Sequence, residues 1–125
     1  MSTGTVDFDC KGPFDEVTAK GVLEGDAFIK VYHRLFESRK NSASVFILVN
    51  ILEFQNQLSV ESFAQILHEA DESHICHINM VVVTLDPARP LIGEMLEALS
   101  TNFIVNIKIT FTDDLEKGRD LVQGR

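Results

Sequence analysis

The chain has 125 residues, of which 45% are hydrophobic and 24% charged, and its formal net charge at pH 7 is −8. This length and balance predict one globular domain over residues 1–125, and the negative field argues against nucleic acid or an anionic lipid surface as a partner. The sequence has two cysteines, no signal-peptide pattern and only short apolar runs, so we expect a cytoplasmic protein without a membrane span.

The first part of the chain predicts a β-hairpin followed by a helix. Residues 6–8 and 17–19 can form two short strands, and residues 11–13 (Lys-Gly-Pro) are typical of a turn. The acidic residues of this hairpin are expected on a solvated face: Asp7, Asp9, Asp15 and Glu16. Residues 26–38 change to a helical period that starts at Phe28, with Gly25 and Asp26 as the expected N-cap. Arg39 and Lys40 follow at the predicted helix end, where the helix dipole accounts for both.

Two apolar runs predict the centre of a parallel sheet. Residues 45–49 and 80–83 are apolar at every position, as expected of inner strands that are covered on both faces. Between them, a polar loop at residues 53–57 leads to a helix with Ser59 as its N-cap and with Leu58 and Phe63 as a hydrophobic staple. The strand–helix–strand order favours parallel pairing through right-handed crossovers.

The last part of the chain predicts a helix, an edge strand and a final short helix. Asp86 and Pro87 have the form of a cap and a first-turn proline, while Pro90 either makes this turn irregular or moves the helix start toward itself. Residues 105–111 alternate apolar and polar, so one face of this strand is wet and the strand is expected at an edge. Asp113 and Glu116 have capping-box spacing at the start of the final helix. The sequence therefore predicts an α/β domain with a mixed sheet of about five strands and about four helices.

Three segments carry a family resemblance. They are residues 45–50, followed by a loop and a helix from Ser59, then residues 80–84, and finally residues 111–118. In the last segment Phe111, Asp113 and Leu115 follow a strand, F-x-D and short amphipathic helix pattern. Together the segments resemble the SpoIIAA-like (STAS/CRAL-TRIO-related) small stand-alone domains, from about Val22 onward. This resemblance implies a SpoIIAA-like fold, in which a mixed sheet with parallel βα units follows the predicted N-terminal hairpin and the helices pack chiefly on one side.

The resemblance also implies where the mechanism of the family would lie. In its anti-sigma-factor-antagonist branch a strand ends in Asp, and a loop with an Asp-Ser-Ser-Gly-type motif is phosphorylated on serine by a kinase partner. Here Asn50 stands at the strand end, and residues 51–62 contain neither Asp-Ser-Ser nor Gly. Ser59 is explained as an ordinary N-cap. We therefore expect the fold without the phosphoswitch, and a binding surface built from the loop at residues 50–62, with Phe54 and Ser62, and from the helix that follows it.

A second candidate binding site lies beyond the predicted second inner strand. Open α/β sheets bind ligands beyond the carboxyl ends of their strands, where Arg89 and Asp86 follow residues 80–83. Asn50 and Thr84 should gather at the same edge. The alternative, which we favour, is a solvated Arg89 that pairs with Asp86 or Glu94.

Enzymatic and metal-binding motifs are missing from the sequence. The histidines and cysteine at positions 68, 74, 76 and 77 fit no zinc spacing, so we expect no metal and no other cofactor. No Gly-x-Ser-x-Gly elbow, phosphate-binding loop or dinucleotide motif is present. Asp86 and Lys108 would supply only two parts of a receiver-type phosphoacceptor. We therefore expect the chain not to be an enzyme, and an activity around Arg89 is only a distant alternative.

Two binding functions remain. The leading expectation is a STAS-like protein-interaction or regulatory module, with a protein partner or a second copy of the chain in a homodimer. The alternative is a small carrier for a lipid or other apolar molecule, suggested by the CRAL-TRIO relation. Phe28, Tyr32 and Phe36 lie at i, i+4 and i+8 on one helix face and, together with Phe54, form either a core or an apolar groove.

Overall fold

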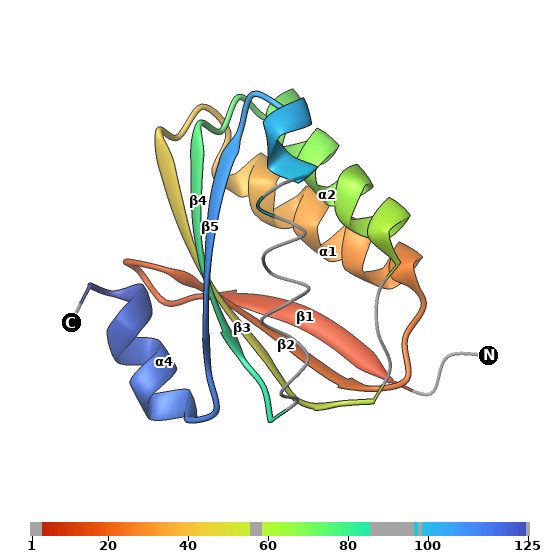
Figure 1. Ribbon diagram of the computed structural model, residues 1–125, viewed down its shortest axis with the longest axis vertical. Helices are drawn as coiled ribbons and strands as arrows, with labels where there is room; N and C mark the ends of the chain where they lie inside the picture. Colours follow the sequence, from red (N-terminus) through yellow and green to blue (C-terminus); the bar gives the residue numbers. More distant parts are fainter. Residues whose placement is uncertain (1–3, 56–58, 86–96, 98, 125) are drawn as a thin grey trace.

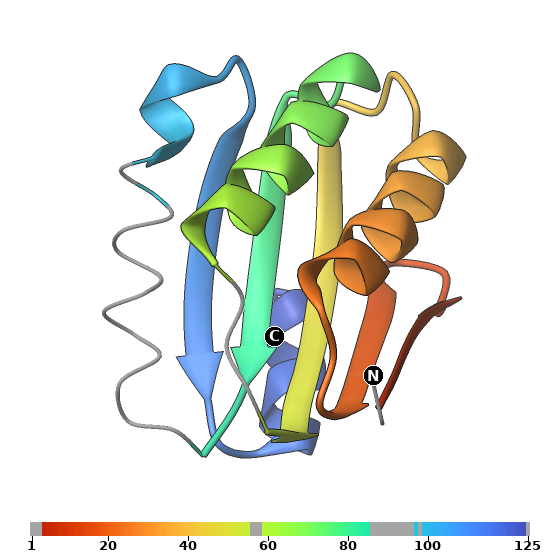
Figure 2. The same cartoon turned by 90° about the vertical axis from the view of Figure 1, so that its right-hand side faces the viewer.

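A computed structural model describes residues 4–55, 59–85, 97 and 99–124 of the chain. Its elements follow in the order β1 (Thr5–Cys10), β2 (Asp15–Gly21), α1 (Gly25–Ser38), β3 (Ser44–Phe54), α2 (Val60–Glu72), β4 (His77–Val83), the 3₁₀ helix η1 (Ser100–Asn102), β5 (Asn106–Thr112) and α4 (Leu115–Val122). Figures 1 and 2 show α1 and α2 side by side on one face of the sheet and α4 on the other face. The predicted α/β fold is confirmed. The helix predicted after Asp86 lies almost entirely outside the described residues.

The sheet has the order β1-β2-β3-β4-β5. β1 and β2 form an antiparallel hairpin, and every other neighbouring pair is parallel. Both the predicted hairpin and the predicted parallel βα units are therefore confirmed. β5 is an edge strand, as its alternating sequence predicted, and the carboxylate of Glu97 accepts a hydrogen bond from its Ile109 N–H at 2.7 Å. A side chain thus satisfies one of the backbone N–H donors at the sheet edge, which would otherwise be free to pair with another strand.

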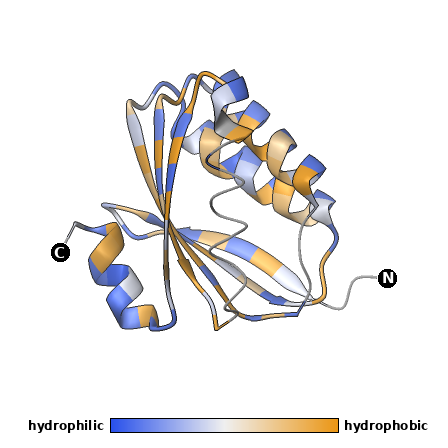
Figure 3. Ribbon diagram, in the orientation of Figure 1, coloured by the Kyte–Doolittle hydropathy of each residue, from blue (hydrophilic) through white to orange (hydrophobic). Residues whose placement is uncertain are grey.

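Alternate residues along each strand supply two separate cores. On the face toward α1 and α2, Ile47, Val49 and Val82 belong to the main core. On the opposite face, Leu48 and Val81 pack with the residues of α4. This double coverage explains why the inner strands are apolar at successive positions. Figure 3 shows the same arrangement, with hydrophobic residues along the strands and on the helix sides that face them.

β3 is longer than the sequence predicted. The polar loop was expected from residue 53, but residues 53 and 54 still belong to the strand. Lys20 pairs with Glu53 and Gly21 with Phe54, so the long second strand of the hairpin holds the end of β3 in the sheet. Pairing with a neighbouring strand has overridden the polar local sequence, as is common for β structure.

Two acidic residues of the hairpin are buried, which contradicts the prediction of a solvated face. Asp15 is 1% exposed and receives two hydrogen bonds from Arg39, at 2.8 Å from Nε and 3.0 Å from Nη2. Glu16 is 8% exposed and accepts from Arg119 Nε of α4 at 3.0 Å. Arg39 therefore lies at the end of α1 because it pairs with Asp15, and the helix dipole is not the main reason. This hydrogen bond also raises the pKa of the Arg39 guanidinium.

α4 packs closely on the sheet because of a glycine. A Cβ atom added at Gly118 would lie 2.8 Å from Val83 Cγ2 and 3.1 Å from Leu48 Cδ1. The N-cap of α4 is Asp114, which accepts from Lys117 N–H at 3.1 Å, and not Asp113 as predicted. No helix in the described ranges combines the length and the apolar composition needed to span a bilayer.

The N-terminus of α1 also departs from the prediction. Its N-cap is Glu24, which makes no side-chain capping hydrogen bond, so neither Gly25 nor Asp26 is the cap. Gly25 instead lets α1 approach the start of α2, because a Cβ atom there would overlap the side chain of Ser62. The absence of a side chain therefore brings the first turns of α1 and α2 together.

Candidate functional site

The candidate site is an apolar cavity of about 70 Å³ between the helices and the sheet. Its described lining comes from α1, β3, α2, β4 and β5. The residues are Phe28, Tyr32, Val49, Ile51, Phe54, Phe63, Ile66, Leu67, Met80, Val82, Ile107, Ile109 and Phe111. The Tyr32 hydroxyl is the only side-chain hydrogen-bonding group of the usual kind in this set, because every other described lining residue is hydrocarbon or a thioether. The cavity therefore lies between the helix layer and one face of the sheet.

The register of the parallel strands forms the floor of the cavity. Val49 of β3 is aligned with Val82 of β4, and Val82 in turn is aligned with Phe111 of β5. Met80 and Ile109 form a second aligned pair. Side chains that alternate along each strand all point to the same face in such a row. The alternating sequence of β5 thus contributes to the site as well as to the edge of the sheet.

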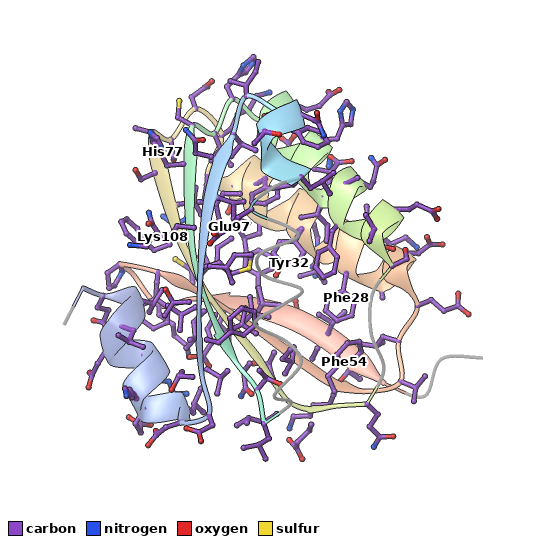
Figure 4. The ribbon with its side chains drawn as sticks, viewed as in Figure 1. Phe28, Tyr32, Phe54, His77, Glu97 and Lys108 are labelled. Carbon is purple, nitrogen blue, oxygen red and sulfur yellow. The ribbon has the colours of Figure 1, made fainter. Side chains whose placement is uncertain are left out.

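Aromatic side chains form the wall on the side of α1. Phe28 and Phe54 meet edge to face, with ring centroids 5.1 Å apart. Tyr32 and Phe36 are one turn apart on α1, with ring centroids at 5.8 Å. Figure 4 shows Tyr32 and Phe28 in the space between α1 and the sheet, with Phe54 nearby. Aromatic pairs of this geometry stabilise by about 0.5–1.5 kcal/mol beyond their burial, which keeps this wall in place.

Tyr32 carries a buried hydroxyl without a protein acceptor among the described residues. The residue is 4% exposed, and its burial raises the pKa of the phenol far above its ordinary value. The phenol is therefore protonated at neutral pH and is a hydrogen-bond donor. A buried donor without a partner costs about 1–3 kcal/mol, so its presence in an otherwise apolar lining needs an explanation.

Phe54 and Asn50 from the predicted binding loop lie on opposite faces of β3. Phe54 is buried in the cavity wall, so it is not part of an exposed loop. Asn50 is half-buried on the face toward α4, and its Oδ1 accepts from Leu52 N–H at 3.2 Å. The structure therefore does not bring these two side chains together.

Ser59 and Ser62 hold the start of α2. Ser59 Oγ accepts from Ser62 N–H at 3.1 Å, and the two hydroxyl oxygens lie 3.0 Å apart. Ser59 is thus the N-cap of α2, as its position in the sequence predicted. Both side chains have a local structural role.

The candidate site beyond β4 is described only in part. Thr84 is buried, and its N–H donates to the Thr112 carbonyl at 2.9 Å. Asn50 is aligned with Val83, so Asn50 and Thr84 are close along the sheet edge. Asp86 and Arg89 lie outside the described residues, and their grouping with these two residues stays a prediction.

The histidine and cysteine residues form no converging ligand set in the described ranges. His68 pairs with Glu72 of the same helix at 3.0 Å. His74 occupies the left-handed turn after α2 with φ of 57°, and Cys76 is exposed.

An ion pair links the outer sides of the two helices that cover the cavity. His33 Nδ1 of α1 and Glu69 Oε2 of α2 are 2.7 Å apart. Their hydrogen bond raises the pKa of His33 and lowers the pKa of Glu69. The pair is therefore a pH-sensitive contact between α1 and α2.

The face of the sheet beside α4 is covered only in part. Phe46 of β3 is 40% exposed there, in a row with Asn79 and Lys108. α4 packs mainly on β3, β4 and β5, with Val83 and Leu48 among its neighbours, and its Arg119 also pairs with Glu16 of β2. An aromatic side chain is thus exposed beside polar neighbours on this face.

The strand order, the N-terminal hairpin and the helices on both faces define a SpoIIAA-like fold. The chain is similar to the crystal structure of an uncharacterised protein of the DUF3478 family with a SpoIIAA-like fold, from Shewanella loihica PV-4. The two share 12% sequence identity and a TM-score of 0.61 over 98% of this chain and 95% of that chain. No family model matches the sequence. No curated protein matches it either. The predicted SpoIIAA-like fold is thus confirmed, and at this identity the likeness concerns the fold alone.

The sequence placed Tyr32 in an aromatic stripe of a helix, but it did not predict that Tyr32 lines a cavity. A helical period predicts which residues face inward, but it does not predict where neighbouring elements leave space. One signal was present, since Tyr32 is the only tyrosine of the chain, which has nine phenylalanines. A single hydroxyl within an otherwise apolar helix face marks a buried polar group whose partner has to be found.

Proposed function

We propose that this protein is a non-enzymatic binding domain of SpoIIAA-like fold that holds a small apolar molecule between its helices and its sheet. The observation that carries this proposal is the cavity of about 70 Å³, whose described lining is apolar except for the Tyr32 hydroxyl. Empty apolar cavities stay dry and take up apolar ligands, whereas polar cavities hold water. The function that the sequence placed second, a carrier of an apolar molecule, is therefore the one that the geometry supports best.

The chemistry of the described lining also supports binding without catalysis. Apart from the Tyr32 phenol, none of these residues can act as an acid, a base or a nucleophile. The same phenol has a pKa far above its ordinary value, which is unsuitable for proton transfer at neutral pH. The cavity can select a ligand by shape, apolar contact and one hydrogen bond.

Native mass spectrometry of the full chain, purified from its source cells, tests this proposal. We expect a co-purifying small molecule with the wild type. Val82→Leu should remove it, because Val82 lines the cavity and the larger side chain fills the space. Val81→Leu is the matched control, since Val81 is also buried but packs on the side of α4. Equal ligand occupancy in both variants, or a ligand-free wild type that binds no apolar probe, would refute the proposal.

The protein-interaction module is a second candidate, favoured by the exposed Phe46 beside α4. Exposed aromatic side chains are enriched at protein interfaces. The same mass spectra would then show a stable dimer or a bound protein, without a small molecule. Phe46→Ser should dissociate that complex and leave the cavity unchanged, because Phe46 does not line it.

A further inference from the structure

We propose that the cavity accepts an uncharged molecule with a carbonyl-type acceptor, such as a ketone, an aldehyde or an ester, and that the Tyr32 hydroxyl donates a hydrogen bond to this acceptor. The inference rests on the proposed function and names the class of ligand. It starts from Tyr32, a residue that is 4% exposed, lines an apolar cavity and has no acceptor for its hydroxyl among the described residues.

The hydroxyl needs an acceptor from outside the described part of the chain. Tyr32 packs against the Phe36 ring and lines the cavity with Phe28. An aromatic ring is a much weaker hydrogen-bond acceptor than a water or a carbonyl oxygen, so neither ring satisfies the hydroxyl. A phenol is a donor as well as an acceptor, and it keeps its proton here because burial raises its pKa. A ligand acceptor in the cavity satisfies the donor and removes the cost of its burial.

The lining excludes charged ligands. None of the described lining residues carries a positive or a negative charge. A carboxylate or an ammonium group would therefore be buried without a counter-ion, which is far more costly than the burial of a neutral acceptor. The formal net charge of −8 further disfavours anions near the protein. The acceptor is thus neutral.

The volume limits the part of the ligand that enters. The cavity of about 70 Å³ is roughly half of the 150 Å³ that takes up benzene in an engineered apolar site. A short alkyl ketone, or the end of a longer molecule, matches this space. Butanone is therefore a suitable probe, with its methylene isostere (=CH₂ in place of the carbonyl oxygen) and butanoate as comparisons.

Amide NMR titrations of the full chain with the three probes test the inference. In the wild type we expect butanone and the isostere to bind and butanoate not to bind at pH 7. In Tyr32→Phe, the dissociation constant of butanone should rise roughly 2- to 10-fold relative to that of the isostere, as expected for the loss of one neutral hydrogen bond. This ratio cancels general effects of the substitution on the cavity, because both probes have nearly the same shape.

The outcomes separate the inference from the proposed function. If both neutral probes bind but Tyr32→Phe leaves their ratio unchanged, the carbonyl inference is wrong and the apolar cavity site stands. Binding of butanoate as tight as that of butanone also overturns the inference. If neither neutral probe binds the wild type, both the inference and the proposed function fail. Val82→Leu should weaken both neutral probes while it keeps Tyr32, and Val81→Leu should weaken neither.

Discussion

Removal of the Tyr32 hydroxyl should stabilise the ligand-free protein. Tyr→Phe substitutions at a hydrogen-bonded buried tyrosine usually destabilise, because the acceptor loses its partner. Here the hydroxyl is buried and has no acceptor among the described residues, so Tyr32→Phe removes a desolvation cost of about 1–3 kcal/mol. Loss of the few dispersion contacts of one oxygen offsets part of this gain, with about 0.1–0.2 kcal/mol for each contact. We expect a net gain of about 1–2 kcal/mol.

The change is large enough to measure by thermal and chemical unfolding. For a chain of 125 residues, an unfolding entropy of about 2.1 cal/mol/K per residue makes 1 kcal/mol equivalent to about 4 °C in Tm. Tyr32→Phe should therefore raise Tm by about 4–8 °C, and raise the urea midpoint without a change of m-value. Protein refolded from denaturant must be used, because a bound ligand would itself stabilise the wild type. A decrease of stability by 1 kcal/mol or more would show that the hydroxyl already has a partner.

Three further predictions concern the framework around the cavity. Arg39→Met should destabilise by about 3 kcal/mol, because it leaves the buried Asp15 carboxylate without its partner, and urea unfolding measures this. Gly118→Ala should destabilise by about 1–2 kcal/mol, although alanine favours helices, since the added Cβ would lie 2.8 Å from a sheet side chain. The stability difference between the wild type and His33→Gln should be largest between pH 4.5 and 6.5. These limits are the ordinary pKa values of the two groups, 4.5 for Glu69 and 6.5 for His33. Because the pair lowers the pKa of Glu69 and raises the pKa of His33, the difference should fall as pH falls through the folded-state pKa of Glu69 and as pH rises through that of His33.

Two of these variants, Arg39→Met and Gly118→Ala, have a matched control in the chain. Arg34→Met breaks an exposed pair with Asp7 and should cost about 1 kcal/mol or less. Lys117→Ala, at an exposed position of α4, should change stability by about 0.5 kcal/mol or less. Equal losses for the two arginine variants, or a stabilised Gly118→Ala, would contradict the packing described above. A pH-independent effect of His33→Gln would contradict the role of its pair with Glu69.

The fold could be predicted because its signals are local. The apolar runs of β3 and β4, the alternation of β5 and the N-cap Ser59 each depend on a few adjacent residues. The wrong predictions concern features that depend on residues far apart in the sequence. Asp15 and Glu16 look solvated in the sequence, but arginines 24 and 103 positions away pair with them. Likewise, β3 continues to Phe54 because the hairpin pairs with it.

The sequence predicted some of the residues that line the candidate site, but not the cavity that they form. The sequence suggested that Phe28, Tyr32 and Phe54 form either a core or a groove, and it gave no means to choose. That choice depends on the space that α1, α2 and three strands leave between them, a property of the packed structure. The polar residues that were predicted to bind a partner or ligand do not line the cavity. Ser59 and Ser62 hold the start of α2, and Asn50 lies on the other face of the sheet.

A crystal structure of the ligand-free protein under xenon pressure tests the central claim most directly. Xenon binds in dry apolar cavities and does not compete for polar sites that hold water. We predict a xenon atom between α1, α2 and the sheet, in contact with Tyr32, Met80 and Val82, and its loss in Val82→Leu. A cavity filled by side chains, or an ordered water that is hydrogen-bonded to the Tyr32 hydroxyl in place of xenon, would contradict the claim.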